Sequence, residues 1–137
     1  MVPKINKNCI ILMGKVKAGL GKGRYFMSQK GYKTQFIRKL GINPYHGTLN
    51  VALSGRNLEK MAKIRDMDGI KIKGFRSGGK NFGEVIAYNA RISSAECALV
   101  IPKRSIHKEI AEIVSSSHLR SKLHLSEGSS VKITILV

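Results

Sequence analysis

The sequence predicts a mainly β protein, folded as a small closed barrel with a few short helices. Short apolar or alternating segments recur at even spacing along the chain, and glycine-rich turns separate most of them. Five or six short antiparallel strands with such corners fit a closed barrel better than an open sheet with crossover helices. At 137 residues the chain can bury one good core, so we expect a single domain over residues 1–137.

The first predicted strand, residues 9–13, leads into a glycine-rich basic loop over residues 14–25. Glycines alternate there with larger residues, which lets the backbone approach a ligand closely and lets its amides line an anion. Basic side chains surround these glycines, at Lys15, Lys17, Lys22 and Arg24. The pattern alone leaves two interpretations open: a phosphate-binding loop, or a plain connection between strands.

Residues 32–40 predict a short helix, with Phe36, Ile37 and Leu40 on its apolar face and Gly41 at its end.

Residues 48–53 alternate as a strand, with the apolar side chains facing inward and Thr48 and Asn50 facing outward together. Two neutral oxygen donors on one strand face suit Mg²⁺ that arrives already chelated by a nucleotide's phosphates. The alternative is that both are ordinary solvent-facing residues.

The remaining predicted elements are shorter or less regular. We expect, in order, a weak helical turn at residues 58–64, a hairpin of strands at 69–75 and 82–92, and a strand buried on both sides at 95–101. A helix at 105–114, a helical turn at 118–125 and a closing strand at 131–137 follow.

The chain is strongly basic. Lys and Arg number 25 against 8 acidic residues, which gives a formal net charge of +17. Such an excess favours polyanionic partners, and charge alone favours nucleic acid among them. The basic residues are spread along the chain with no block of like charges, which argues against a disordered arm.

Cys9 and Cys97 both lie in apolar segments, so we expect two buried thiols and no disulfide. No segment has the length of a membrane span, and a reducing cytoplasm is the expected location. The spacings of a P-loop, a dinucleotide fingerprint and a histidine zinc site are absent from the sequence.

Two motifs, in order, carry a resemblance to a known family: Gly-Leu-Gly-Lys-Gly-Arg-Tyr at residues 19–25 and Pro-Tyr-His-Gly-Thr-Leu-Asn at residues 44–50. Together with residues 100–103, 109–112 and 119–120, they make nearly the whole chain similar to the archaeal CTP-dependent riboflavin kinases. The resemblance implies a six-stranded cradle-loop barrel. It also implies transfer of the γ-phosphoryl group of CTP to the 5′-hydroxyl of riboflavin, which yields FMN and CDP.

The resemblance also implies roles for individual residues. Thr48 and Asn50 would meet one Mg²⁺, and Ser105 and Glu112 would contact the flavin, with Glu112 as a candidate base. The CTP or CDP would be held by two segments, namely Leu20, Gly21, Lys22, Gly23, Arg24 and Tyr25, and Ser117, His118, Leu119, Arg120, Ser121 and Lys122.

This chain departs from the family pattern in two ways. Ser105 stands where the family tends to carry Thr, and the segment between Ser105 and Glu109 is one residue shorter. Some family members also carry an N-terminal helix-turn-helix domain, which we do not expect here. We expect a monomer without a membrane partner. Two alternatives remain open: a basic barrel that binds nucleic acid, and a protein that binds flavin without turnover.

Overall fold

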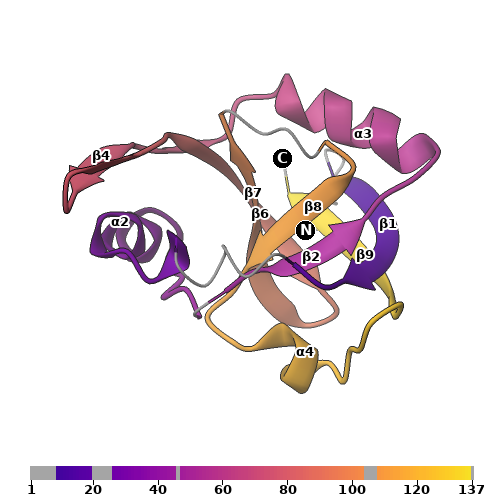
Figure 1. The fold of residues 1–137 in the computed structure, drawn as a ribbon. Coiled ribbons are helices and arrows are strands. Elements are labelled where there is room, and N and C mark those ends of the chain that lie inside the picture. Colours follow the sequence, from indigo (N-terminus) through magenta and orange to yellow (C-terminus); the bar gives the residue numbers. More distant parts are fainter. Residues whose placement is uncertain (1–8, 20–25, 46, 104–107, 137) are drawn as a thin grey trace, which may run out of the picture.

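Six antiparallel strands close into a barrel in the computed structural model, which describes residues 9–19, 26–45, 47–103 and 108–136. The strands follow the order β6-β7-β8-β2-β1-β9, and β9 pairs back onto β6 to close the barrel (Figure 1). Their bounds are β1 Cys9–Lys17, β2 Leu49–Ala52, β6 Val85–Ile92, β7 Ala95–Pro102, β8 Ile110–Val114 and β9 Ser130–Leu136. The predicted mainly β closed barrel is confirmed.

Alternate residues of the strands fill the barrel interior. The innermost side chains are at most 2% exposed and include Leu12, Val51, Leu99, Ile113, Ile133 and Ile135. Because side chains alternate across a strand, the residues between them face outward. Leu49, Val51 and Leu53 are buried as the sequence predicts, so Asn50 lies on the outer face.

A second, smaller core lies outside the barrel wall. The helix α2 (Lys30–Leu40) packs there with β3 (Ile70–Ile72) and the two-stranded ribbon of β4 (Phe75–Ser77) and β5 (Lys80–Phe82) (Figure 1). Tyr32 and Phe36 of α2 share this core with Val100 of β7. β7 is therefore covered on both faces, as its nearly continuous apolar sequence predicts.

The helix α3 (Arg56–Arg65) covers a part of β1 that β2 does not reach. The backbone N–H of Met13 donates to Asn57 Oδ1 at 2.9 Å, and Lys60 Nζ donates to the carbonyl oxygen of Ile11 at 3.0 Å. These side chains bond to backbone groups of β1 that a neighbouring strand would otherwise bond. The helical turn predicted at residues 58–64 is confirmed, and the helix is longer.

The prediction of a helix over residues 105–114 is wrong. Residues 110–114 form β8, which pairs with β2 on one side and β7 on the other. Apolar residues at 106, 110 and 113 mimic a helical period, but pairing between two strands that need a neighbour overrides that local pattern. Residues 104–107, with Ser105, lie outside the described residues.

The structure also differs from the sequence prediction in the bounds of two predicted elements and in one face of the helix α2. The first strand continues through Lys17, so Lys15 and Lys17 are strand residues. The predicted hairpin is divided in two: β3 pairs with β6, and β4 with β5. On α2, Ile37 is 50% exposed although the sequence places it on the apolar face. Gly41 ends the helix with φ of 70°, as predicted.

Both cysteines are free thiols, as predicted, but only Cys97 is buried, and Cys9 is half-buried. Burial raises the pKa of the Cys97 thiol to about 12. Across the described ranges, every helix is too short or too polar to cross a membrane.

The two neighbouring apolar residues Phe36 and Ile37 test the corrected orientation of α2. Phe36 is fully buried, so Phe36→Ala should lower the free energy of unfolding by about 3–5 kcal/mol. Ile37→Ala should lower it by less than about 1 kcal/mol, because Ile37 is half exposed. Urea denaturation of both variants measures the difference, and equal losses would mean that Ile37 is also a core residue.

Candidate functional site

Three polar side chains form a row across the outer face of the barrel. β2 lies between β1 and β8, and the register pairs Asn50 with Lys17 on one side and with Glu112 on the other. Directly opposite residues in antiparallel strands have Cβ atoms about 4.5–5.5 Å apart. The barrel therefore places an amine, an amide and a carboxylate side by side, although they lie far apart in the sequence.

The chain that follows β1 passes directly over this row. A Cβ atom on Gly19 would collide with the amide group of Asn50. A side chain at this position would require the Asn50 amide to move, so glycine lets the backbone lie close to Asn50 as it is placed here. The next six residues, Leu20 to Tyr25, lie outside the described part of the chain.

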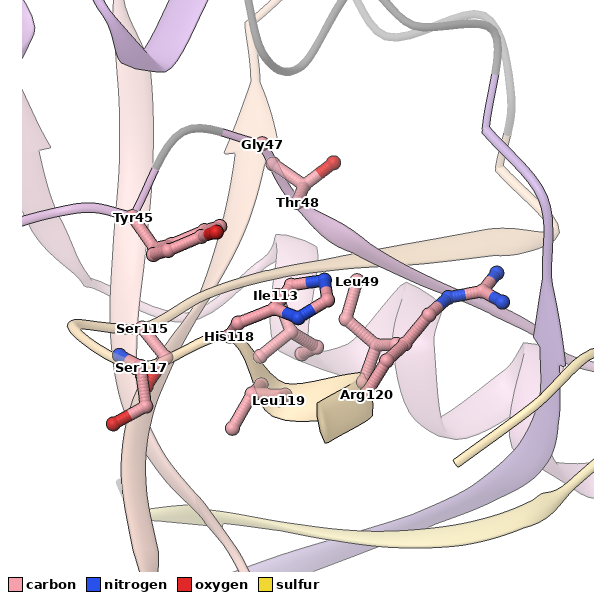
Figure 2. A pocket seen from close by; sticks show the side chains of 10 residues that line it. All are labelled: Tyr45, Gly47, Thr48, Leu49, Ile113, Ser115, Ser117, His118, Leu119 and Arg120. Carbon is pink, nitrogen blue, oxygen red and sulfur yellow. Dashed lines mark hydrogen bonds between the residues drawn. The ribbon is translucent and has the colours of Figure 1, made fainter. Parts of the chain in front are cut away.

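A cavity of about 90 Å³ adjoins the row where β2 begins. Its lining comes from the turn before β2 and from the segment around α4 (Leu119–Lys122), and consists of Tyr45, Gly47, Thr48, Leu49, Ile113, Ser115, Ser117, His118, Leu119 and Arg120 (Figure 2). Cavities that enclose a whole ligand have about 300–1,000 Å³. This one therefore suits a single ring or group of a ligand that extends over the surface.

Two rings form a wall of the cavity. The centroids of Tyr45 and His118 are 5.0 Å apart, with 31° between the ring planes (Figure 2). The Nδ1 atom of His118 lies 2.7 Å from the hydroxyl oxygen of Ser121, which fixes the orientation of the imidazole. Both rings are exposed, so each offers a flat surface to a planar ligand.

Ser115 holds the far side of the cavity in place. Its buried hydroxyl donates to the carbonyl oxygen of Glu96 at 3.0 Å and accepts from the backbone N–H of Ser117 at 3.3 Å. The carbonyl oxygen of Ser115 accepts from the N–H of Tyr45 at 2.8 Å. One residue thus links β7, the turn before β2 and the segment leading to α4.

The charges around the site favour an anionic ligand. Lys17 and Arg120 are basic, and Glu112 is the acidic member of the row. Arg120 Nη2 lies 3.8 Å from Glu127 Oε1, but this pair is weak because the distance is long and the Glu127 side chain is exposed. The guanidinium of Arg120 consequently stays available to a phosphate.

Most of the predicted site residues that the structure describes lie together. Thr48 lines the cavity and leads to Asn50, Asn50 lies opposite Glu112, and residues 117–120 line the cavity. Ser121 and Lys122 are exposed on α4 and do not line it. Residues 20–25 and Ser105 lie outside the described residues.

Several contributors to the cavity were not predicted from the sequence: Tyr45, Gly47, Leu49, Ile113 and Ser115. Gly19 belongs to the predicted glycine loop, but its contact with Asn50 was not predicted. Tyr45 stands inside the motif of residues 44–50, which was an available signal. Nothing in the local sequence marks Ser115, because its role depends on contacts with residues distant in the chain.

The oxygen donors on the outer face fit a magnesium ion that is held mainly by other ligands. The described part of the chain contains no cluster of three or more His, Cys, Asp or Glu residues. Thr48 and Asn50 offer neutral oxygens, and Glu112 adds a carboxylate directly opposite Asn50. Mg²⁺ prefers oxygen ligands and keeps several waters, so few protein donors suffice when phosphates supply the rest.

Comparison with known proteins gives a consistent result. A family model for CTP-dependent riboflavin kinases, described as "Domain of unknown function DUF120", matches residues 16–135. The chain is 41% identical over 122 residues to a riboflavin kinase of Picrophilus torridus and 38% identical over 129 residues to one of Thermoplasma acidophilum. It is 41% identical over 136 residues to a riboflavin kinase of Ignicoccus hospitalis.

The matches cover most of this chain and a smaller share of the relatives. The aligned regions span 89%, 94% and 98% of this chain, and 55%, 59% and 76% of the three relatives. The chain thus spans a little over half the length of the first two relatives.

Ser115 and Ser116 provide a test of the cavity's support. Ser115→Ala removes a buried hydroxyl with two hydrogen bonds, so the free energy of unfolding should fall by about 1–3 kcal/mol. Ser116→Ala removes an exposed hydroxyl that accepts one bond from the N–H of Asn43 and should cost less than about 1 kcal/mol. Thermal and urea denaturation measure the stability of both variants. An unchanged free energy of unfolding in Ser115→Ala would contradict the role of Ser115 in supporting the cavity.

Proposed function

Because the chain belongs to the CTP-dependent riboflavin kinase family, we propose that it transfers the γ-phosphoryl group of CTP to the 5′-hydroxyl of riboflavin, giving FMN and CDP. One observation supports this assignment most strongly. The cavity and the row of Lys17, Asn50 and Glu112 meet at β2, so a nucleotide at one and an acceptor alcohol at the other would lie next to each other.

The cavity is the proposed site of the cytosine ring. Its volume of about 90 Å³ fits one ring, and Tyr45 and His118 offer flat surfaces beside it. The segment from Ser117 to Lys122 then borders the cytidine, with Arg120 directed to its phosphates. The phosphates lie toward Asn50, where the backbone of Gly19 opens the glycine loop of residues 20–25.

Phosphoryl transfer depends on positioning and on neutralisation of charge rather than on a protein nucleophile. Thr48 and Asn50 are the proposed protein ligands of one Mg²⁺, which when bound neutralises charge on the nucleotide's phosphates. Lys17 stands beside Asn50 and adds a fixed positive charge to the same side of the site. The amides of the glycine loop, together with Lys22 and Arg24, complete the phosphate site in this proposal.

Glu112 is the proposed contact to the acceptor. It lies opposite Asn50, so it would hold the 5′-hydroxyl of riboflavin next to the phosphates, either by a hydrogen bond or by accepting the hydroxyl proton. Ser105 is the second proposed flavin contact. We further propose that the chain acts as a monomer.

The decisive assay is incubation of the full chain with riboflavin, Mg²⁺ and each nucleoside triphosphate in turn, followed by chromatographic separation of FMN. The proposal predicts FMN with CTP and little with ATP, GTP or UTP. Flavin fluorescence that is quenched on binding without FMN formation, under every nucleotide, would instead identify a flavin-binding protein without turnover.

Asn50→Ala and Thr48→Ala test the proposed metal ligands. Each should lower kcat at saturating CTP and riboflavin about a hundredfold or more, because charge stabilisation at the transferring group is lost. The matched control is Asn89→Ala, an exposed asparagine on β6 far along the barrel wall, which should retain full activity. Melting temperatures should stay close to that of the unmodified protein in all three, and unchanged kcat in both site variants would exclude this metal site.

Glu112→Gln keeps the size of the side chain and removes its charge. We expect kcat/KM for riboflavin to fall about 10–100-fold while the Kd for CDP is retained, because Glu112 is assigned to the acceptor side. Glu96→Gln, an exposed carboxylate on β7, is the control and should have no effect. A loss of CDP affinity with normal riboflavin kinetics would place Glu112 on the nucleotide side instead.

A further inference from the structure

Positive charge is concentrated outside the barrel wall, in what we call the basic lobe: α2 (Lys30–Leu40) with residues 70–82, which include β3, β4 and β5. The lobe contains eight basic residues and no acidic residue: Lys30, Lys33, Arg38, Lys39, Lys71, Lys73, Arg76 and Lys80. All of them are exposed except Lys33, which is half-buried. None of the residues that line the cavity beside β2 belongs to the lobe.

The concentration is local and does not merely follow from the basic composition. The helix α3 carries four basic residues, but Glu59 lies within it and Asp66 and Asp68 follow it. The basic side chains of α3 thus have acidic neighbours close in the chain. Neither segment of the lobe contains an acidic residue, and the nearest in the chain are Asp68 and Glu84, on either side of residues 70–82.

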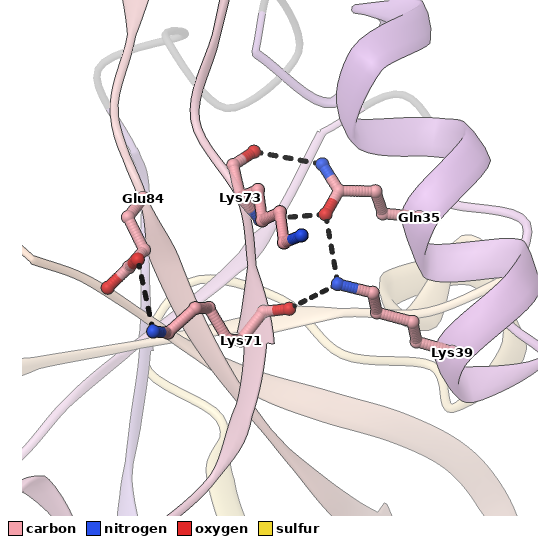
Figure 3. A network of polar contacts seen from close by, with 5 residues as sticks. All are labelled: Gln35, Lys39, Lys71, Lys73 and Glu84. Atoms are coloured by element: carbon pink, nitrogen blue, oxygen red, sulfur yellow. Dashed lines mark hydrogen bonds and ion pairs between the residues drawn. The ribbon is translucent and has the colours of Figure 1, made fainter.

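Hydrogen bonds fasten the two halves of the lobe together (Figure 3). Gln35 on α2 pairs with the backbone of Lys73: Nε2 donates to the carbonyl oxygen at 2.8 Å, and Oε1 accepts from the N–H at 2.7 Å. Lys39 Nζ donates to the carbonyl oxygen of Lys71 at 2.6 Å. These acceptors are uncharged, so the ammonium of Lys39 keeps its positive charge within the lobe.

Aromatic rings of the lobe pack against one another and make it rigid. The ring of Phe75 lies against the backbone of Gly31, where an added Cβ would be 2.6 Å from it. Phe75 also packs against Tyr32 and Phe82, with ring centroids 4.8 and 4.9 Å apart. The charges are therefore held on a firm surface, and these rings are engaged with one another rather than presented for stacking on bases.

We infer that the basic lobe is a second binding surface, which binds the sugar-phosphate backbone of nucleic acid without reading its sequence. α2 alone is about 16 Å long, so the charges span several phosphates rather than one small anion. Glu84 lies 3.8 Å from Lys71 and can offset at most one of the eight positive charges. Such a surface is polar and strongly positive, as protein–DNA interfaces are.

The lobe is less suited to a lipid surface. Peripheral membrane binding combines basic residues with apolar side chains that enter the headgroup region. The tip of the ribbon is Ser77-Gly78-Gly79-Lys80, which is polar. Within the lobe, Ile37 is the large apolar side chain that stands half exposed.

The test uses fluorescence anisotropy of the full chain with a labelled 24-base-pair DNA duplex of arbitrary sequence, in 50–200 mM KCl. Two triple variants are compared with the unmodified protein. Lys30→Gln/Arg38→Gln/Arg76→Gln removes three exposed charges from the lobe, and Arg56→Gln/Lys63→Gln/Lys132→Gln removes three exposed charges elsewhere. Net charge is therefore equal in the two variants.

The unmodified protein should bind the duplex with an affinity that falls steeply with salt. The lobe variant should bind at least tenfold more weakly. The slope of the logarithm of its binding constant against the logarithm of the salt concentration should be shallower by about 0.9 for each phosphate that the variant no longer neutralises. The control variant should change affinity less than threefold. FMN formation should be equal in all three proteins, which separates this surface from the kinase site.

Three outcomes would overturn the inference. The first is the absence of measurable duplex binding by the unmodified protein at 50 mM KCl. The second is equal weakening in the two triple variants, which would assign binding to net charge alone. The third is binding to vesicles of phosphatidylcholine and phosphatidylserine without binding to the duplex, which would identify a membrane surface.

Discussion

The pairing of β2 between β1 and β8 is the constraint on which the candidate site depends. Antiparallel register sets Lys17, Asn50 and Glu112 beside one another on the outer face, while Leu49 and Val51 hold the same strand to the core. A slip of one residue would turn all of these side chains to the opposite face. The burial of Val51 and Ile113 inside the closed barrel therefore also fixes the geometry of the polar row.

Periodicity along the sequence predicted the elements whose pattern is strong and local. The alternation of residues 48–53, the apolar segment 95–101 and the end of α2 at Gly41 all follow from it. The prediction failed at residues 105–114, where the spacing of Ser105 and Glu109 suggested a helix cap, but pairing with two neighbouring strands stabilises β8. That error mattered, because only a strand at residues 110–114 brings Glu112 opposite Asn50.

The candidate site residues were proposed from motifs rather than from periodicity. From the pattern alone, Thr48 and Asn50 fitted an ordinary solvent-facing strand better, and the resemblance suggested a metal-binding role for them. The contacts that the sequence could not supply are those between distant segments: Gly19 against Asn50, Tyr45 beside His118, and Ser115 bonded to β7. The cavity's small volume fits a protein that orients ligands on its surface, with the barrel as a rigid support.

The central claim is that a metal–nucleotide complex lies on the outer face of β2, next to Glu112. Paramagnetic broadening of backbone amide signals by Mn²⁺·CDP in the ¹⁵N-labelled full chain tests it most directly, because broadening falls steeply with distance from the ion. We expect the strongest broadening at Thr48, Asn50 and Glu112, and none in a sample with CDP and Mg²⁺. Strongest broadening on α2 and the β4–β5 ribbon, with β2 unaffected, would contradict it.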